Sequence, residues 1–458
     1  ARNSKSEIYV GIQPPPDPEN WIQDEDTVDT WFSSWLWAYE TMDLETRKKF
    51  YPTSVLVTAA DIIFFWVARM IIAGLEFKPG KSHKIEDNIA FHHVFFTSIV
   101  RDSQGRKMSK SLGNSPDPLE LIAKYGADGM RFGLMRIAPT GQDIRFDERQ
   151  IEEGRNFATK LWNVARFRQM HGPSEAAPTI ETERLSIYAV EVLARLNETI
   201  DAIESAYREY HFNLVAQHLY NFVWNDYCDW FVEAAKTEIF STDEARKRSA
   251  LAVMDVVLSA TLRLLHPFMP HLTEEIWSLL WFGEGSIQFA APPEKFALQA
   301  VADVSERRRL VSAVYETVQA GRNLKSESKL PSNRKIRFIL RTDDKSISEQ
   351  IPAITRLLNA EELTLDPQYE ATPGTPVAVT PFGELFLAIA AVDQARERNR
   401  LDTQIAKIDG EARAVEAKLQ NKAFVERAPT AVVEKHRRRL SDLTAQLTKL
   451  KQAREGLS

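Results

Sequence analysis

The chain has little of the residue that cross-links proteins or holds clustered metal ions. Its 458 residues include a single cysteine, Cys228. One thiol excludes an internal disulfide and any zinc site built from several cysteines, and it indicates a reducing compartment. Cys228 lies among Trp224, Tyr227 and Trp230, so we expect it to pack in a core rather than to react.

Long hydrophobic runs are also missing. The most apolar window, residues 62–75, is too short to span a bilayer and contains Arg69. We therefore expect a buried helix there and no membrane partner. The N-terminus is polar and resembles no secretory signal. With the cysteine usage, this predicts a cytoplasmic protein.

An overall positive charge is absent, but the charge is unevenly spread. The formal net charge is −6. Residues 393–458 hold 15 lysines and arginines against 10 acids, whereas the remaining residues hold 43 against 54. A basic tail on an acidic body predicts a polyanionic partner for that tail.

The most informative stretch lies between Gly105 and Gly113. Residues 107–111 have the sequence Lys-Met-Ser-Lys-Ser, and Arg106 precedes them. Cations and hydroxyl groups on a glycine-bounded loop suit the binding of a polyphosphate whose charge shifts during a reaction. A solvated basic turn is the ordinary alternative for a short basic run.

The surroundings of this loop predict a parallel α/β sheet. A β-branched run at residues 51–58 is typical of a buried parallel strand, and we expect a helix capped near Asp61 to follow it. A second apolar run, residues 94–100, leads into the loop. Ligands of such sheets bind at the carboxyl ends of the strands, where the loop lies.

Two different patterns follow. Residues 147–290 show apolar positions every three or four residues, which predicts a helical bundle. Residues 300–390 predict a smaller mixed region, with a helix at 306–320 ending before Gly321 and strands at 335–341, 377–380 and 384–390.

The tail follows a heptad pattern. Its apolar positions are Leu401, Ile405, Ile408, Ala412, Val415 and Leu419, then Val433, Leu440, Leu443, Leu447 and Leu450 after a break at residues 421–429. This spacing predicts two helices folded back as an antiparallel coiled coil. Dimerisation through the same positions is the alternative.

Several segments together resemble one family. Lys-Met-Ser-Lys-Ser is the signature of class I aminoacyl-tRNA synthetases, and Asp29 to Ser34 (Asp-Thr-Trp-Phe-Ser-Ser) is similar to an element of valyl-tRNA synthetases. Residues 155–163 and 267–275 resemble the anticodon-binding bundle of this subclass, and residues 418–429 resemble the valyl C-terminal arm. Isoleucyl and leucyl enzymes carry an acid before the serine, so Ser33 and Ser34 favour the valyl family.

The resemblance implies a fold and a division of the chain. We expect the second half of a Rossmann-like parallel sheet, an all-α helical bundle, a small α/β region and a C-terminal antiparallel coiled coil. The expected segments are a connector (1–50), the catalytic half with the loop (51–146), the anticodon-binding bundle (147–295), the mixed region (296–390) and the tRNA-binding arm (391–458).

The resemblance also implies an activity, valine–tRNA ligation. Valine is activated by ATP, which brings Mg²⁺ as part of the substrate, and is then transferred to tRNA-Val; no resident metal is expected. Lys107 and Lys110 would stabilise the phosphates, and Met108, Ser109 and Ser111 would complete the ATP-binding loop. Trp31 and Trp66 would line the valine pocket, and Asp61 would orient the substrate. Arg437, Arg438 and Arg439 would contact the tRNA backbone.

Three departures limit the resemblance. The chain contains no His-x-Gly-His sequence, it contains no inserted editing domain, and it has Ser98 where a glycine is expected. We therefore expect the C-terminal portion of a synthetase that is monomeric at full length, and we expect this portion to be inactive alone in adenylate formation. The alternatives are a synthetase-derived tRNA-binding module without catalysis and an isoleucyl- or leucyl-type enzyme.

Overall fold

The structure is a computed structural model, and its description covers most of the chain. It describes residues 2–3, 7–78, 80–109, 111–175, 178–331, 333–372, 375–388, 391–420 and 430–455. The chain forms two compact units, each built from three segments: 1–179, 193–228 and 252–296 in the first, and 180–192, 229–251 and 297–458 in the second. The five expected segments remain a prediction.

The first unit contains the predicted parallel strands. β3 (Thr53–Ala59) pairs in parallel with β4 (Phe91–Thr97), in a register that joins Val55 to His93 and Ala59 to Thr97. Val67, Met70, Ala90 and Phe91 form the core beside this pair. Apolar and β-branched residues therefore form a parallel β-α-β arrangement, as the sequence predicts.

Short helices surround this pair. They are α1 (Thr30–Ser34), α2 (Trp37–Glu40), α3 (Leu44–Phe50), the 3₁₀ turn η2 (Ala60–Ile62), the π-helical turn η3 (Ile63–Val67) and α4 (Ala68–Glu76). A second parallel pair joins β5 (Val100–Arg101) to β6 (Ile144–Arg145). In the residues that the structure describes, these are separate two-stranded ladders and not one wide sheet. The N-terminal pair of β1 (Arg2–Asn3) and β2 (Trp21–Ile22) is antiparallel and includes the turn η1 (Pro18–Asn20) between its strands.

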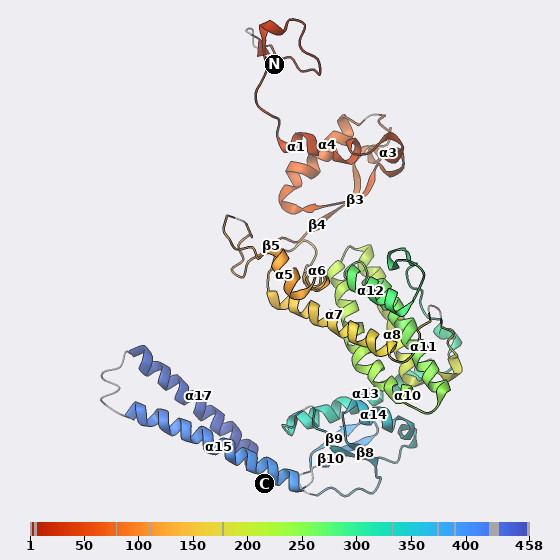
Figure 1. Cartoon of the computed structure of the whole chain (residues 1–458), viewed down its shortest axis with the longest axis vertical. Helices are drawn as coiled ribbons and strands as arrows, with labels where there is room; N and C mark the ends of the chain where they lie inside the picture. Colours follow the sequence, from red (N-terminus) through yellow and green to blue (C-terminus); the bar gives the residue numbers. More distant parts are fainter. Residues whose placement is uncertain are drawn as a thin grey trace. The chain divides into compact units, whose positions relative to one another are not determined.

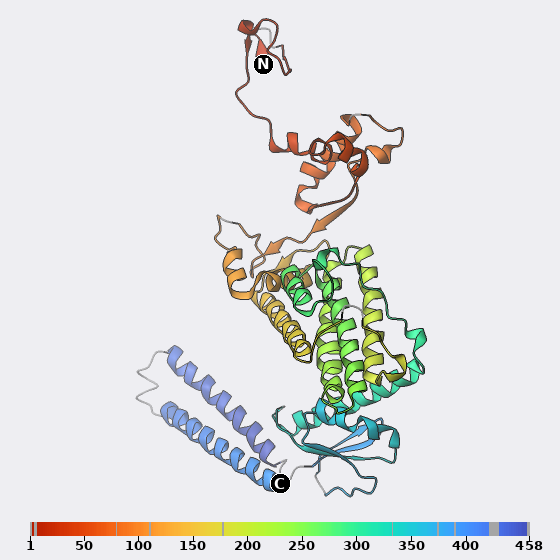
Figure 2. The same cartoon turned by 45° about the vertical axis from the view of Figure 1, so that its right-hand side comes forward.

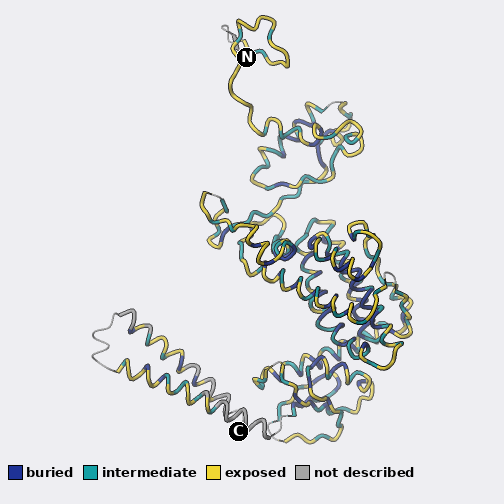
Figure 3. The backbone as a smooth tube through the Cα atoms, in the orientation of Figure 1, coloured by how far each residue is buried: buried dark blue, intermediate teal, exposed yellow. Residues whose placement is uncertain are grey.

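Helices make up most of the rest of this unit and the start of the second (Figure 1). They are α5 (Pro118–Tyr125), α6 (Ala127–Arg136), α7 (Glu148–Gln169), α8 (Ile187–Arg208), α9 (Phe212–Asn221), the π-helical η6 (Phe222–Val232), α10 (Glu233–Ile239), α11 (Glu244–Leu265) and α12 (Pro270–Leu280). Many of their residues are buried (Figure 3). Cys228 lies buried in η6, as the sequence predicts.

Small residues let α6 and α7 approach closely. A Cβ added at Gly154 would lie 2.2 Å from the carbonyl oxygen of Gly129. Phe132 of α6 stacks on Phe157 of α7 with ring centroids 4.6 Å apart. The close approach packs α6, which follows the loop, directly against α7 of the helical bundle. A larger residue at Gly154 would force the two helices apart.

The second unit contains a four-stranded sheet. Its order is β8 (Glu362–Leu365), β7 (Arg337–Arg341), β10 (Gly383–Ala388), β9 (Val377–Thr380), with β7 and β8 parallel and the other pairs antiparallel. β7, β9 and β10 confirm the three predicted strands, whereas β8 was not predicted. This unit also contains the 3₁₀ turns η5 (Thr182–Arg184), η8 (Leu298–Ala300) and η9 (Lys345–Gln350) and helix α14 (Ile351–Leu357), whereas the turn η7 (Ile287–Phe289) belongs to the first unit.

The helix preceding this sheet is longer than predicted. α13 (Val304–Glu327) continues through Gly321 instead of ending before it. A Cβ at Gly321 would lie 2.5 Å from Leu358 and 3.2 Å from Leu385. The glycine therefore serves close packing on the sheet and not helix termination, a distinction that sequence alone does not make.

Two long helices form the C-terminal segment. α15 (Ala391–Gln420) and α17 (Thr430–Glu455) pack through Ala412, Val415, Leu443 and Leu447. They lie side by side in both views (Figure 2). The predicted break, residues 421–429, lies outside the described residues. None of the helices that the structure describes is long and apolar enough to cross a membrane.

Candidate functional site

The lysine loop follows β5 as a tight turn. The Asp102 amide donates to the Arg106 carbonyl at 2.9 Å, the Gly105 amide donates to the Asp102 carbonyl at 2.9 Å, and Arg101 and Lys107 form an antiparallel bridge. Gly105 has φ +82°, a left-handed conformation that favours glycine. The glycine before the lysines is thus required by this turn.

The second half of the loop is held by hydroxyl groups. Ser109 and Ser111 lie with their Oγ atoms 3.2 Å apart, and the Leu112 amide donates to the Ser109 hydroxyl at 3.3 Å. Gly113 has φ +59°. Met108 and Ser109 are half-buried, whereas Ser111 is exposed. Lys110 lies outside the described residues, so its role stays a prediction.

Lys107 reaches across to the segment after β3. Its ammonium lies 2.6 Å from the Asp61 carboxylate, and both side chains are largely exposed. The hydrogen bond from Lys107 lowers the pKa of the Asp61 carboxyl. The contact unites two residues assigned to one site from separate motifs, at the carboxyl end of β3.

The expected capping role of Asp61 is wrong. No side chain caps η2 or η3, and the chain passes through 3₁₀ and π-helical turns before α4 begins at Ala68. The Asp61 carboxylate accepts a hydrogen bond from Lys107 instead of from a helix amide. A charged partner distant in sequence competes here with the local cap.

Trp31 and Trp66 lie in neighbouring turns. The Trp66 indole donates to the Ser34 carbonyl at 2.9 Å, and Trp31 stacks on Phe65 with centroids 5.8 Å apart. Both tryptophans are half-buried. The structure therefore brings α1 and η3 together, although their role in lining a valine pocket stays a prediction.

Ser98 occupies the position where the resemblance predicts glycine. Its hydroxyl donates to the Pro139 carbonyl at 2.8 Å, so it holds β4 to the segment that follows α6. The departure from the family pattern thus has a local structural use.

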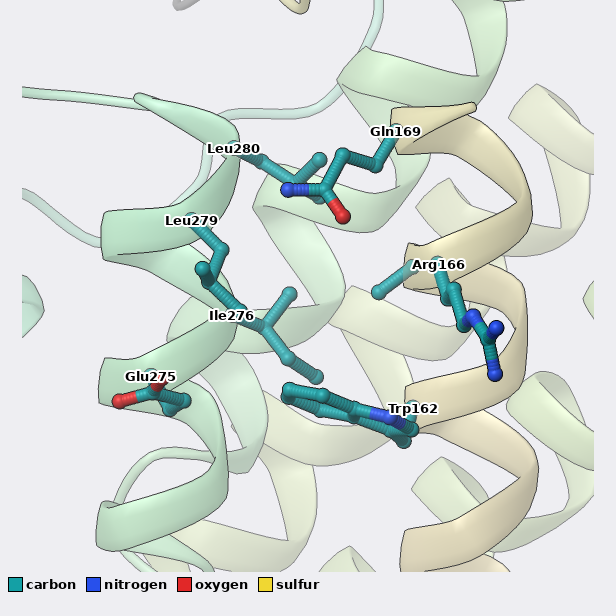
Figure 4. A pocket seen from close by; sticks show the side chains of 8 residues that line it. Trp162, Arg166, Gln169, Glu275, Ile276, Leu279 and Leu280 are labelled. Carbon is teal, nitrogen blue, oxygen red and sulfur yellow. The ribbon is translucent and has the colours of Figure 1, made fainter. Parts of the chain in front are cut away.

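A recess in the helical bundle was not predicted. It has a volume of about 380 Å³ and lies between α7 and α12. Trp162 and Arg166 of α7 face Ile276 and Leu279 of α12 across it (Figure 4). An aromatic face beside an exposed guanidinium can stack on a nucleobase and pair with phosphate.

The three arginines of the tail are exposed on α17. The Arg439 guanidinium lies 3.7 Å from the Glu411 carboxylate of α15, which partly neutralises it. Arg437 and Arg438 are also exposed. Across the described residues, no three His, Cys, Asp or Glu side chains lie together as a metal ion would require.

Three protein families match consecutive parts of the chain. The family "tRNA synthetases class I (I, L, M and V)" matches residues 4–147, "Anticodon-binding domain of tRNA ligase" matches residues 190–340, and "Valyl tRNA synthetase tRNA binding arm" matches residues 393–458. The lysine loop and the tail each fall within one of these matches, and the anticodon-binding match covers the helical bundle from residue 190 onward.

Curated relatives match almost the whole chain. The valine–tRNA ligase of Oceanobacillus iheyensis is 39% identical over 457 residues, which are 97% of this chain and 50% of that protein. That of Bacillus licheniformis is 40% identical over 451 residues, 96% of this chain and 50% of that protein. The chain thus spans about half the length of these relatives.

A solved structure is more distant. The methionyl-tRNA synthetase of Mycobacterium tuberculosis bound by methionyl-adenylate covers 58% of this chain and 50% of that chain, with a TM-score of 0.43 and 23% identity. On the family matches and the relatives, the chain belongs to the valine–tRNA ligase family of class I aminoacyl-tRNA synthetases.

Proposed function

We propose that this chain supplies the ATP-facing loop and the tRNA-binding parts of a valine–tRNA ligase. The observation that carries the proposal is the contact between Lys107 and Asp61 in a chain related to valine–tRNA ligases over 97% of its length. It brings the lysine of the phosphate-binding signature next to the residue predicted to orient the amino acid.

The proposed reaction has two steps. A carboxylate oxygen of valine attacks the α-phosphorus of ATP, and pyrophosphate leaves as valyl-adenylate forms. A ribose hydroxyl at the 3′ end of tRNA-Val then attacks the adenylate carbonyl, and AMP leaves. ATP would enter with Mg²⁺, and the protein would contribute positioning and neutralisation of charge.

The structure supports distinct roles for the two contacting residues. Asp61 would bind the ammonium group of valine, because a carboxylate accepts hydrogen bonds from either cation. Lys107, released from Asp61, would then meet the phosphates together with Lys110. Since Asp61 and Lys107 are both largely exposed, exchanging one partner for another requires little desolvation.

The tRNA would be held by the bundle and the tail. The recess beside Trp162 and Arg166 would take a nucleobase, and α15 and α17 would form an antiparallel coiled-coil arm. Arg437 and Arg438 would face the backbone of the tRNA. Such contacts give affinity that depends on salt and not on sequence.

A tRNA-binding module without catalysis is the second candidate. Because the 458-residue chain contains no His-x-Gly-His sequence, we expect it alone not to form adenylate. An isoleucyl- or leucyl-type enzyme is disfavoured by Ser33 and Ser34 and by the match of the tail to the valyl arm.

Binding of labelled tRNA-Val to the 458-residue chain tests the tRNA half of this proposal. Fluorescence anisotropy at several salt concentrations should show an affinity that falls linearly on logarithmic axes. The double variant Arg437→Glu/Arg438→Glu should flatten that slope, whereas Lys48→Glu, on exposed α3, should not. No binding at low salt, or equal slopes in all three proteins, would refute it.

A further inference from the structure

Asp102, at the start of the lysine loop, has an unusual number of hydrogen bonds for a loop residue. Its carboxylate accepts from the amides of Gln104 at 3.0 Å and Arg106 at 2.8 Å, and from the Arg106 guanidinium at 2.8 Å. It also accepts from the Asn114 side chain at 2.9 Å. The Asp102 side chain is only 9% exposed. Protein hydrogen-bond donors therefore take the place of most of the water that would otherwise solvate this carboxylate.

Asn114, at the far end of the loop, makes the complementary contacts. While its Nδ2 donates to Asp102, its Oδ1 accepts from the Ser109 amide at 3.0 Å. Its Nδ2 also lies 3.4 Å from the carbonyl oxygen of Lys107. One amide side chain thus touches both the lysine and the serine of the signature.

These side chains close the loop where backbone pairing does not. Backbone hydrogen bonds hold the first half, from Asp102 to Arg106. For the described loop residues, the links between that half and residues 108–114 run through the side chains of Asn114 and Asp102. The bonds to Gln104 and Arg106 make an ordinary local turn, but the bond to Asn114 spans twelve residues.

We propose that Asp102 and Asn114 are positioning residues that close the lysine loop and present Lys107 and Ser109 to a polyphosphate. The function of this placement rests on the proposed ligase activity. We call the Asp102–Asn114 and Asn114–Ser109 hydrogen bonds together the clamp. The existence of this clamp does not depend on the ligase activity.

The chemistry of the pair is directional. An ionised carboxylate only accepts hydrogen bonds, whereas the amide of Asn114 has one group of each kind and uses both. The hydrogen bond from Asn114, with those from Arg106, holds the pKa of Asp102 well below its usual range, so the carboxylate stays ionised at neutral pH. Asp102→Asn would turn an NH2 group toward one of the two pairs of donors that the carboxylate now accepts from, and Asn114→Asp would place two carboxylates opposite one another.

Amide hydrogen exchange of the 458-residue chain, followed by mass spectrometry, tests the clamp without requiring catalysis. Asn114→Ala should speed exchange at Ser109 and Leu112 about tenfold, the factor that corresponds to losing one good hydrogen bond. Asp102→Asn and Asn114→Asp alone should each do the same. The exchanged pair, Asp102→Asn with Asn114→Asp, restores one donor opposite an acceptor between the two side chains but loses the bond to the Arg106 guanidinium, so its loop exchange should be slower than in either single variant and faster than in the wild type.

The matched control is Ser103→Ala, an exposed position in the same turn, which should leave the loop unchanged. Exchange in α7 should be equal in all variants, which separates loop opening from unfolding. Unchanged loop exchange in Asn114→Ala, or an exchanged pair as fast as the single variants, would overturn the clamp. Failure of the proposed function would appear instead as absent tRNA binding by a chain whose loop is still protected.

Discussion

The buried ion pair between α7 and α11 offers a test of what holds the first unit together. Arg168 is 3% exposed and Asp255 is 1% exposed. The Arg168 guanidinium donates to Asp255 at 2.7 Å and to the carbonyls of Gly172 and Pro173 at 3.0 Å. The amide of Glu175 donates to the same carboxylate at 3.2 Å. The pair thus joins α11 to α7 and to the segment after α7.

Replacing Asp255 by alanine should lower the free energy of unfolding by about 3–5 kcal/mol. The variant keeps the Arg168 charge buried with carbonyl partners only, and breaking a buried pair from one side typically costs this much. The double variant Arg168→Met/Asp255→Leu removes both charges and fills similar space. It should lie within about 2 kcal/mol of the wild type, since desolvation offsets most of the attraction in a buried pair.

Urea unfolding followed by circular dichroism measures both values. The transition that includes α7 and α11 should be fitted separately, because two compact units need not unfold together. Asp201→Ala is the matched control. It breaks an exposed pair with Lys295, whose atoms are 2.6 Å apart, and should barely move the midpoint. A loss below about 1 kcal/mol for Asp255→Ala, or a double variant as unstable as the single one, would refute the reasoning.

Three further predictions concern other parts of the chain. Tyr51 donates to a backbone carbonyl at 2.6 Å, and burial raises its pKa to about 12 from 10.0. Because the unfolded chain releases this proton first, the free energy of unfolding should fall as the pH rises from 10.0 to about 12. Urea midpoints should fall less in Tyr51→Phe, and an equal fall in both proteins would contradict this. In Gly154→Ala the new Cβ meets the Gly129 carbonyl, so the free energy of unfolding should fall by about 1–3 kcal/mol. In Gly410→Ala the new Cβ meets nothing within 4 Å, so the variant should be more stable than the wild type. Thermal melting temperatures that shift in the same direction in both variants would contradict the packing argument. Arg438→Glu should lower the salt slope of tRNA binding by about 1 in anisotropy titrations, and an unchanged slope would remove this residue from the interface.

The elements that the sequence predicted well are those with a clear period. The β-branched run at residues 51–58 became β3, and the strand expected at residues 377–380 is β9 with the same bounds. Ala412, Val415, Leu443 and Leu447 of the heptad pattern are buried between α15 and α17. In each case one periodic pattern selects one buried face, and no distant residue competes with it.

The contacts of the site could not be predicted in the same way. Lys107 and Asp61 are 46 residues apart, and Asp102 and Asn114 lie outside the five-residue signature. The acid of Asp61 looks like a helix cap until its distant partner is known. The only sequence signal for the clamp is that Asp102 and Asn114 flank the lysines, and many loops contain such residues.

The most direct test of the proposed function is valine-dependent ATP–pyrophosphate exchange in a chimera. The chimera replaces the matching half of the Oceanobacillus iheyensis valine–tRNA ligase, which is 39% identical, with this chain. The account predicts exchange that requires valine and that is lost in both Lys107→Ala and Lys110→Ala. A folded, tRNA-binding chimera without exchange, or exchange that persists in both lysine variants, would contradict it.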